Sequence, residues 1–267
     1  MLARQRQERI LDEVRAHGGV RISDLVDLLD VSDMTVRRDI EQLSARGLVE
    51  RVHGGAAAVG GRSAEEPGFV AKSALAQQQK QAIARAAARL ISPGETVAMS
   101  AGTTTLAVAQ ELLAVPDLTV VTNSPPVADL MHDPGRPDRT VILVGGVRTP
   151  SNALVGPVAV AALRTLHVDT LILGIHGMTE RAGLTTPNLV EGETDRALVE
   201  AARRVLVVAD HSKWGVIGLS TIADLADVDV LVSDAGLTST ARESLSAVVG
   251  SLVIADDEDI HEDGGDA

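Results

Sequence analysis

Hydrophobic positions follow two different patterns along this chain. In the first 57 residues they recur three or four positions apart, with polar residues between them, which is the spacing of amphipathic helices. From residue 73 onward, short runs of β-branched residues alternate with helical stretches. The first pattern predicts a small helical domain over residues 1–57. The second predicts an α/β domain over residues 73–255, with a largely parallel sheet buried on both faces.

The N-terminal pattern predicts three helices. Residues 4–16 form the first of them. The apolar positions of the next two are spaced to bury one face each: Ile22, Leu25, Val26 and Leu29, then Val36, Ile40 and Leu43. The link between these two helices, residues 30–32, is long enough only for a tight turn. The stretch from Val20 to Asp39 is therefore predicted to be a helix-turn-helix.

The polar face of the third helix fits a DNA major groove. Ser32 occupies the N-cap position, where its hydroxyl would accept hydrogen bonds from backbone N–H groups. The residues opposite or beside the apolar stripe are Met34, Thr35, Arg37, Arg38 and Glu41. In a groove, the first helical turn meets base edges, and guanidinium groups bind guanine or phosphate. A solvated surface helix would show the same spacing, so this helix alone leaves both interpretations open.

The residues that follow favour DNA binding. Residues 48–53 have strand character and lead into Gly54-Gly55, which is typical of a hairpin turn. Three helices followed by a hairpin form a winged helix. Its wing would bring Arg51 and His53 beside the DNA backbone.

Seven apolar runs predict the strands of the second domain. They are Thr96–Met99, Leu118–Thr122, Thr140–Val144, Thr170–Leu173, Val205–Ala209, Val230–Ser233 and Leu252–Ala255. An alanine-rich helix is predicted over Ala71–Leu90, before the first strand. Residues 58–72 have the glycine and proline content of a linker, and the acidic tail 256–267 is predicted to be disordered.

Composition and charge narrow the class of protein. The absence of cysteine excludes disulfides and thiol catalysis and fits a cytoplasmic protein. A single phenylalanine, a single tryptophan and no tyrosine leave no aromatic platform for single-stranded bases, so any nucleic acid bound is duplex. No apolar run is long enough to span a bilayer, so no membrane partner is expected. The net charge of −13 lies mostly outside the first 57 residues, which hold nine arginines and ten acids.

Polar and glycine-rich motifs follow the predicted strands. They are Ser100 to Thr105, Asn123, Gly145-Gly146, Gly174 to Gly177 and Asp210 to Lys213. Because the carboxyl ends of parallel strands meet at one edge of a sheet, these motifs are expected to converge there. The hydroxyl-rich loop with Gly102, Thr103, Thr104 and Thr105 precedes a helix and would present N–H groups to an anion, although an ordinary capped turn would look the same. Lys80 and Lys213, two of only three lysines, are candidate partners for a phosphate, or chance surface lysines.

Both regions resemble the DeoR family of bacterial transcriptional regulators. The resemblance rests on Val31 to Ile40 and Gly47 to Ala56, and then on Lys80, Ser100 to Thr104, Asn123, Gly145-Gly146, Gly183 to Thr185 and Ala209 to Lys213. It implies a sensor domain that binds phosphorylated sugars and is similar in fold to ribose-5-phosphate isomerases. It also implies a phosphate cradle at Gly102 to Thr105 with Lys213, and sugar contacts from Asn123 and Glu193. Met99 departs from the family, in which an acid commonly precedes this loop.

Two other functions fit parts of the sequence. An isomerase with a DNA-binding head would need a general base and a second acid. However, no carboxylate follows Leu173 in Gly174 to Met178, which leaves Glu193, His176 and His211 as weak candidates. A scaffold that only docks protein partners would not explain the ordered strand-end motifs. We therefore expect a cytoplasmic homo-oligomeric repressor of a carbohydrate-metabolism operon. It would bind operator DNA and a phosphorylated sugar or polyol, without catalytic residues, metal or cofactor.

Overall fold

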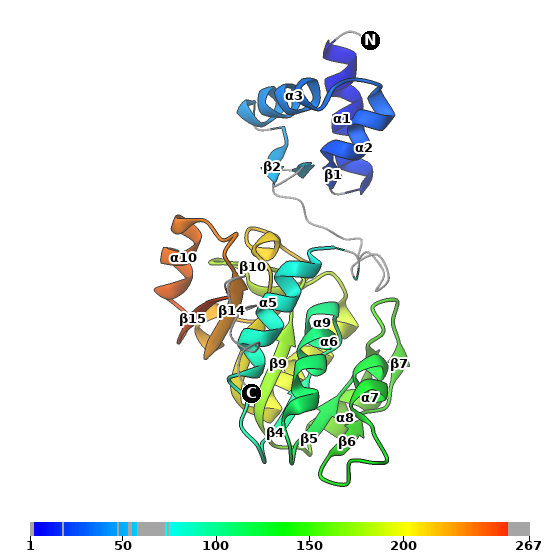
Figure 1. The fold of residues 1–267 in the computed structure, drawn as a ribbon, viewed down its shortest axis with the longest axis vertical. Helices are drawn as coiled ribbons and strands as arrows, with labels where there is room; N and C mark the ends of the chain where they lie inside the picture. Colours follow the sequence, from blue (N-terminus) through cyan, green and yellow to red (C-terminus); the bar gives the residue numbers. More distant parts are fainter. Residues whose placement is uncertain are drawn as a thin grey trace, which may run out of the picture. The chain divides into compact units, whose positions relative to one another are not determined.

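The computed structural model describes residues 3–17, 19–46, 48–52, 55–57, 73 and 75–255 of the chain. The chain divides into two compact units, Met1–Ser63 and Ala64–Ala267, which are described separately (Figure 1). The predicted linker 58–72, the predicted disordered tail 256–267 and His53 lie outside the described residues. Within the described part, no helix is both long enough and apolar enough to cross a bilayer.

The N-terminal unit contains three helices and a small sheet. Its elements are α1 (Ala3–His17), β1 (Gly19–Arg21), α2 (Ile22–Leu29), α3 (Asp33–Ala45), β2 (Glu50–Val52) and β3 (Gly55–Ala57). The predicted apolar stripes pack together, with Ile10, Leu25, Val36 and Leu43 at 1% exposure or less. The three helices predicted from the apolar spacing are therefore confirmed.

The wing differs from the sequence prediction in one respect. The sheet has three strands in the order β1-β3-β2, with both pairings antiparallel. Val20 lies in β1 and pairs with Ala56, so assigning Val20 to the helix-turn-helix was wrong and the first helix of that motif begins at Ile22. A strand of three residues is too short for its alternation to be visible in the sequence.

The turn before α3 is built differently from the N-cap that the sequence suggested. Ser32 occupies the N-cap position, and its carbonyl oxygen accepts from the backbone N–H of Thr35 at 2.9 Å and of Val36 at 3.1 Å. The Ser32 hydroxyl makes no capping bond and instead lies 2.9 Å from the Thr35 hydroxyl. The predicted position was right, but the predicted bond was wrong, because a neighbouring hydroxyl competes for the serine oxygen.

Buried polar side chains fix α3 against α1. Asp39 is 3% exposed, and its carboxylate accepts from Arg6 Nε at 2.8 Å and from Gln7 Nε2 at 3.3 Å. Gln7 Nε2 also donates to Gln42 Oε1 at 2.7 Å. These bonds join the inner face of α3 to the first helix, so they determine which side of α3 remains exposed.

The C-terminal unit is built on a seven-stranded sheet in which every pairing is parallel. The strand order is β15-β14-β12-β9-β4-β5-β6. The bounds are β4 (Thr96–Met99), β5 (Thr119–Thr122), β6 (Thr140–Leu143), β9 (Val168–Gly174), β12 (Ala202–Val208), β14 (Val230–Asp234) and β15 (Leu252–Ala255). All seven strands predicted from apolar runs are present, and together they form this sheet.

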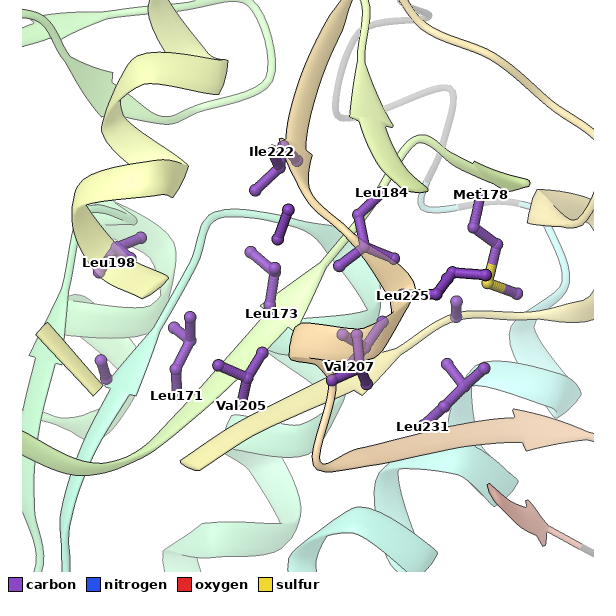
Figure 2. Close-up of a cluster of buried hydrophobic side chains, with 14 of the residues drawn as sticks. Leu171, Leu173, Met178, Leu184, Leu198, Val205, Val207, Ile222, Leu225 and Leu231 are labelled. Carbon is purple, nitrogen blue, oxygen red and sulfur yellow. The ribbon is translucent and has the colours of Figure 1, made fainter. Parts of the chain in front are cut away.

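Both faces of the sheet are buried, except at the edge strand β6, where Ile142 and Leu143 are exposed. Leu171 and Leu173 of β9, together with Val205 and Val207 of β12, point to the side that holds Leu198 (Figure 2). The alternate residues of the same strands pack in a second cluster on the other face. Since successive side chains of a strand point to opposite faces, burial on both sides requires the continuous apolar runs that the sequence shows.

Helices form the outer layers. One face of the sheet packs on α5 (Gln77–Ala88), α6 (Thr103–Glu111) and α7 (Pro125–Met131), and the other on α8 (Pro157–Leu163), α9 (Leu189–Ala201) and α10 (Ser239–Ser246). The prediction of one continuous helix over Ala71–Leu90 was wrong, since Ala76 adopts a left-handed conformation (φ 50°, ψ 42°) and α5 begins at Gln77, while Ala71 and Lys72 lie outside the described residues. A backbone in that region cannot continue a right-handed helix.

Smaller elements lie between the large ones. Two antiparallel sheets were not predicted: β7 (Val147–Arg148) with β8 (Leu154–Val155), and β10 (Gly177–Thr179) with β11 (Gly183–Thr186) and β13 (Ser220–Ala223). Three short 3-10 helices complete the described fold: η1 (Leu112–Ala114), η2 (His211–Lys213) and η3 (Leu225–Asp227).

The order of the strands creates a switch point. From β4 the chain moves outward to β5 and β6, and it then returns to place β9 on the other side of β4. The loops that leave β4 and β9 therefore run in opposite directions, which opens a crevice beyond their carboxyl ends.

An ion pair holds the loop that follows β12. His211 Nδ1 lies 2.7 Å from Asp234 Oδ2, and Asp234 Oδ1 accepts from the His211 backbone N–H at 2.7 Å. Gly236 N also donates to this carboxylate, and a Cβ added at Gly236 would lie 2.4 Å from the histidine ring nitrogen. The hydrogen bond to Asp234 raises the pKa of His211 against the opposing effect of burial. Burial pushes the pKa of Asp234 upward, but the bonds it accepts outweigh burial and lower it.

This pair should make stability depend on pH. Because folding raises the pKa of His211, its protonation stabilises the fold at pH values below the ordinary histidine pKa of 6.5. Because folding lowers the pKa of Asp234, its ionisation stabilises the fold at pH values above the ordinary pKa of 3.8. We expect the stability of the wild type relative to His211→Asn to be greatest between these values. This difference in stability should become smaller as the pH rises through the pKa of His211 in the folded protein. Urea unfolding followed by Trp214 fluorescence at about pH 5 and about pH 8 measures this difference, and an equal difference at both pH values would contradict the assignment.

Removing the carboxylate of Asp39 should loosen the N-terminal unit. Asp39→Ala leaves the Arg6 guanidinium without its buried partner, which we expect to lower the free energy of unfolding by about 2–3 kcal/mol. The control is Asp33→Ala, which removes the exposed pair with Arg37 and should cost much less stability, because water screens an exposed pair. Thermal unfolding of the full chain followed by circular dichroism compares the two. Equal losses of stability would show that Asp39 does not anchor α3.

Candidate functional site

The exposed face of α3 carries the predicted reading residues. Met34 is 74% exposed, and Arg37 and Arg38 are also exposed, while Thr35 is half-buried at the side of the helix. The structure therefore brings these side chains together on the face opposite the buried stripe. The first turn of the helix, preceded by Ser32, is accessible, as a helix that enters the major groove requires.

The two adjacent arginines differ in their surroundings. Arg37 Nε pairs with Asp33 Oδ1, four residues earlier, and this bond is the largest cause of the raised pKa of Arg37. Arg38 has no ion-pair partner among the described residues, so its guanidinium is available to a ligand. Arg51 lies in β2, as predicted, and nothing further is described for its side chain.

The C-terminal unit holds a pocket at the switch point of its sheet. Four adjacent strands, β12, β9, β4 and β5, send their following loops to it. The pocket is lined by Leu75, Ala76, Lys80, Ala101, Gly102, Thr103, Thr104, Asn123, Ser151, Ala153, Gly174, Ile175, His176, Thr186, Glu191, Asp195, Asp210, Ser212, Lys213 and Ile222. Strand ends that are far apart in the sequence therefore form a single site.

One wall of the pocket is suited to an anion. Gly102 is the N-cap residue of α6, and Thr103 and Thr104 form the first turn of that helix. Asn123 is 2% exposed, and its Oδ1 accepts from Ala101 N at 2.9 Å. Within the described part of the chain, Asn123 Nδ2 has no partner, so its two N–H groups are available to a bound molecule.

Both lysines singled out in the sequence line this pocket. Lys213 is half-buried on η2, directly after the loop that the His211–Asp234 pair holds. Lys80 on α5 is only 7% exposed, and its Nζ donates to the carbonyl oxygen of Leu75 at 2.7 Å. An ammonium group in a largely enclosed site attracts an anion more strongly than one in water.

The opposite wall is acidic. Glu191 and Asp195, four residues apart on α9, both line the pocket, and Ser151 donates a short hydrogen bond to Glu191 Oε1. Glu193 was the carboxylate named from the sequence, and the structure places it on the exposed side of α9, outside the lining. Residues 191 and 195 share one helical face, whereas a position two residues from each lies on the opposite side.

Four more predicted residues lie outside the lining, for different reasons. Ser100 is buried, and its hydroxyl accepts from Gly174 N at 3.0 Å, so it joins the loops after β4 and β9. Thr105 is fully buried and donates to the Gly102 carbonyl at 2.9 Å. Gly145 and Gly146 are exposed and lead into β7, where a Cβ at Gly146 would lie 2.6 Å from a backbone oxygen of β8. Ser100 and Thr105 therefore hold the loops that form the pocket, whereas Gly146 lets strands β7 and β8 of the hairpin come close together.

Several lining residues were missed because they come from elements that the sequence did not predict. Thr186 and Ile222 lie on β11 and β13, and Ser151 follows β7. A signal for Glu191 was present, since Asn188 caps α9 and accepts from Val190 N and Glu191 N. That cap fixes the first turn of the helix, but only the folded chain shows which of its acids faces inward.

Comparisons with known proteins agree with this two-part architecture. Residues 6–60 match the DeoR-like helix-turn-helix domain, and residues 75–235 match the DeoR C terminal sensor domain. The HTH-type transcriptional regulator YgbI of Escherichia coli is 37% identical over 259 residues, which cover 97% of this chain and 100% of that protein. GlpR of Haloferax volcanii, also an HTH-type transcriptional regulator, is 36% identical over 254 residues, covering 95% of this chain and 98% of that protein.

A solved structure resembles part of the chain only distantly. Ribose 5 phosphate isomerase A from Neisseria gonorrhoeae is 16% identical, with a TM-score of 0.35, over 51% of this chain and 52% of that one. A likeness at this level carries no conclusion about activity. The family matches, in contrast, cover both units, and the relatives extend over almost the whole chain. The chain belongs to the DeoR family of transcriptional regulators, with a DNA-binding helix-turn-helix head and a C-terminal sensor domain.

Proposed function

We propose that this regulator represses a carbohydrate-metabolism operon, and that a phosphorylated sugar or polyol bound to the sensor controls its operator binding. The observation that carries the proposal is the two-sided pocket. One wall offers a helix N-terminus, threonine hydroxyls and Lys213, and the other offers Glu191 and Asp195. A ligand with an anionic end and a hydroxyl-rich end matches this division of charge.

The phosphate is assigned to the α6 wall. Backbone N–H groups at the start of α6 and the hydroxyls of Thr103 and Thr104 donate toward negative charge, and the helix dipole adds to their effect. Lys213 supplies a compact positive charge on the neighbouring loop. Because hydrogen bonds to a charged phosphate are stronger than neutral ones, most of the discrimination should come from the phosphate.

The sugar hydroxyls are assigned to the acidic wall. Carboxylates of Glu191 and Asp195 accept hydrogen bonds from hydroxyl groups, while the amide of Asn123, beside the start of α6, donates to hydroxyl oxygens from the neighbouring wall. We infer binding and not catalysis, because the relatives that span the whole chain are transcriptional regulators.

The head is proposed to read its operator through α3. A helix-turn-helix presents the start of its second helix to base edges, and arginine recognises guanine through two hydrogen bonds. The single recognition helix of one chain reads one half-site. A homo-oligomer would therefore read half-sites about 34 Å apart, or a multiple of that distance.

Arg38→Ala tests the reading face. If Arg38 contacts a base, its loss should weaken operator binding by about 1–3 kcal/mol and relax the sequence preference at one position. Stability should barely change, because the side chain is exposed. The measurement is operator binding by fluorescence anisotropy at constant salt, with Arg164→Ala in the sensor as the control. Unchanged affinity in a folded Arg38→Ala protein would place the DNA on another face.

Thr104→Glu tests the anion wall. A carboxylate at the start of α6 should repel phosphate, so the response of operator binding to sugar phosphates should disappear while effector-free DNA binding remains. In the wild type, phosphates should change operator affinity about 5- to 150-fold, and their unphosphorylated parents far less. Operator titrations with a panel of pentose, hexose and polyol phosphates measure this response. The fluorescence of Trp214, the only tryptophan, reports binding beside Lys213.

The same incubations separate the sensor from an enzyme. Each sugar phosphate is recovered after incubation with purified protein and analysed for isomerised or deaminated product, which we expect to be absent. Free sugars that act as well as their phosphates, or a full response in Thr104→Glu, would contradict the anion assignment. Turnover that is lost in Asp195→Asn would revive the isomerase.

A further inference from the structure

The turn that leads into α5 is held in an unfavourable backbone conformation. Ala76 has a φ of 50°, a region that residues with a Cβ rarely adopt. Its carbonyl oxygen accepts from Lys80 N at 3.0 Å, so it starts the helix directly after this left-handed residue. The preceding residue, Leu75, is 41% exposed, so part of its side chain lies outside the packed interior.

A pocket residue supplies the bond that closes this turn. Lys80 Nζ donates to the Leu75 carbonyl oxygen at 2.7 Å, and Leu75, Ala76 and Lys80 all line the pocket. Lys80 as a whole residue is 7% exposed, so its charged end lies almost entirely inside the sensor. A ligand in the pocket and the Leu75 carbonyl therefore compete for the position of the same ammonium group.

We infer that Lys80 is the residue that transmits ligand binding to the DNA-binding head. An anion in the pocket draws the Lys80 ammonium away from the Leu75 carbonyl, and the turn at Leu75-Ala76 then relaxes from its left-handed conformation. This inference rests on the proposed function, since it requires an anionic ligand in the pocket.

The direction of the change follows from the strengths of the two bonds. A hydrogen bond from an ammonium group to a phosphate oxygen joins two opposite charges, whereas the bond to Leu75 has a neutral acceptor. A phosphate in the pocket therefore attracts the ammonium group more strongly than the Leu75 carbonyl does. Once the bond to Leu75 is lost, the left-handed conformation of Ala76 loses one of the interactions that hold it, and strained residues persist only where their surroundings maintain them.

The position of the turn explains why its relaxation reaches the head. Leu75 and Ala76 directly precede α5, and the chain that connects the head to the pocket residue Lys80 of this helix passes through them. A change at this turn is therefore made on the covalent connection between the pocket and the head. Direct contact between the head and the pocket is not required.

Lys80→Met distinguishes this role from simple ligand binding. Methionine keeps the length of the side chain but has no ammonium group, so the turn should be relaxed even without ligand. We expect the effector-free variant to show the operator affinity of ligand-saturated wild type, a change of about 5- to 150-fold. A lysine that only bound the anion would give a variant with wild-type affinity for DNA and no response. The control is Gln78→Met on the exposed side of the same helix, which should behave as wild type.

Ala76→Gly changes the turn in the opposite direction. Glycine adopts positive φ without the penalty that alanine has, so the closed turn should become more stable. We expect the response to need about three- to tenfold more ligand than in the wild type. A lower or unchanged midpoint would contradict the proposed strain.

Hydrogen exchange over residues 73–81 follows the turn directly, with inorganic phosphate as the probe. Exchange should become faster in wild type when phosphate is added, and it should already be fast in Lys80→Met without phosphate. If phosphate binds to wild type, as Trp214 fluorescence reports, and exchange does not change, Lys80 does not transmit binding although the proposed pocket stands. If neither phosphate nor the sugar phosphates bind, the proposed function fails, and the ligand-driven step inferred for Lys80 fails with it. Wild-type DNA affinity in effector-free Lys80→Met overturns the inference whatever binds the pocket.

Discussion

The reversal of strand order between β4 and β9 is the constraint on which the sensor depends. Every pairing in the sheet is parallel, so all seven strands end at the same edge. At the reversal, the loops after β4 and β9 separate, and the side chains of four adjacent strand ends face one space. The buried Ser100 hydroxyl, bonded to Gly174 N, ties the two loops together behind that space. The pocket is thus a property of the topology, and the sequence supplies the chemistry placed in it.

The pocket is lined by charges of both signs. The start of α6, Lys80 and Lys213 offer positive charge, while Glu191 and Asp195 of α9 and Asp210 after β12 bring carboxylates to the same pocket. A protein with a net charge of −13 can therefore still offer an anion a local positive site, because short distances and low exposure outweigh the charge of the whole molecule. The same reasoning applies to the head. There Asp39 turns inward to meet Arg6, and the exposed face of α3 keeps its two arginines.

The two units use buried polar bonds for the same purpose. In the head, the bonds among Asp39, Arg6 and Gln7 set the rotation of the reading helix. In the sensor, the His211–Asp234 pair sets the loop that carries Lys213. Hydrophobic packing tolerates small rotations and shifts, whereas a buried hydrogen bond requires a defined geometry. In both units, a buried polar contact therefore lies beside side chains to which we assign a function.

The sequence by itself determined the local structure and the chemical character of both units. Helical spacing of apolar residues predicted α1, α2 and α3, and continuous β-branched runs predicted the seven strands, because burial on one or both faces leaves a direct trace in the sequence. The family resemblance and the hydroxyl-rich loop pointed to a DNA-binding regulator with a sensor.

Only the tertiary structure decided which side chains meet. Helical position alone did not tell whether Glu191 or Glu193 faces the pocket, since that depends on how α9 packs against the sheet. The short strands β1 and β11 are defined by pairing partners that are distant in the sequence, β3 and β13, and strands this short leave no periodicity of their own. The left-handed turn at Ala76 was likewise hidden, because alanine strongly favours helix and its conformation here is imposed by contacts of the folded chain.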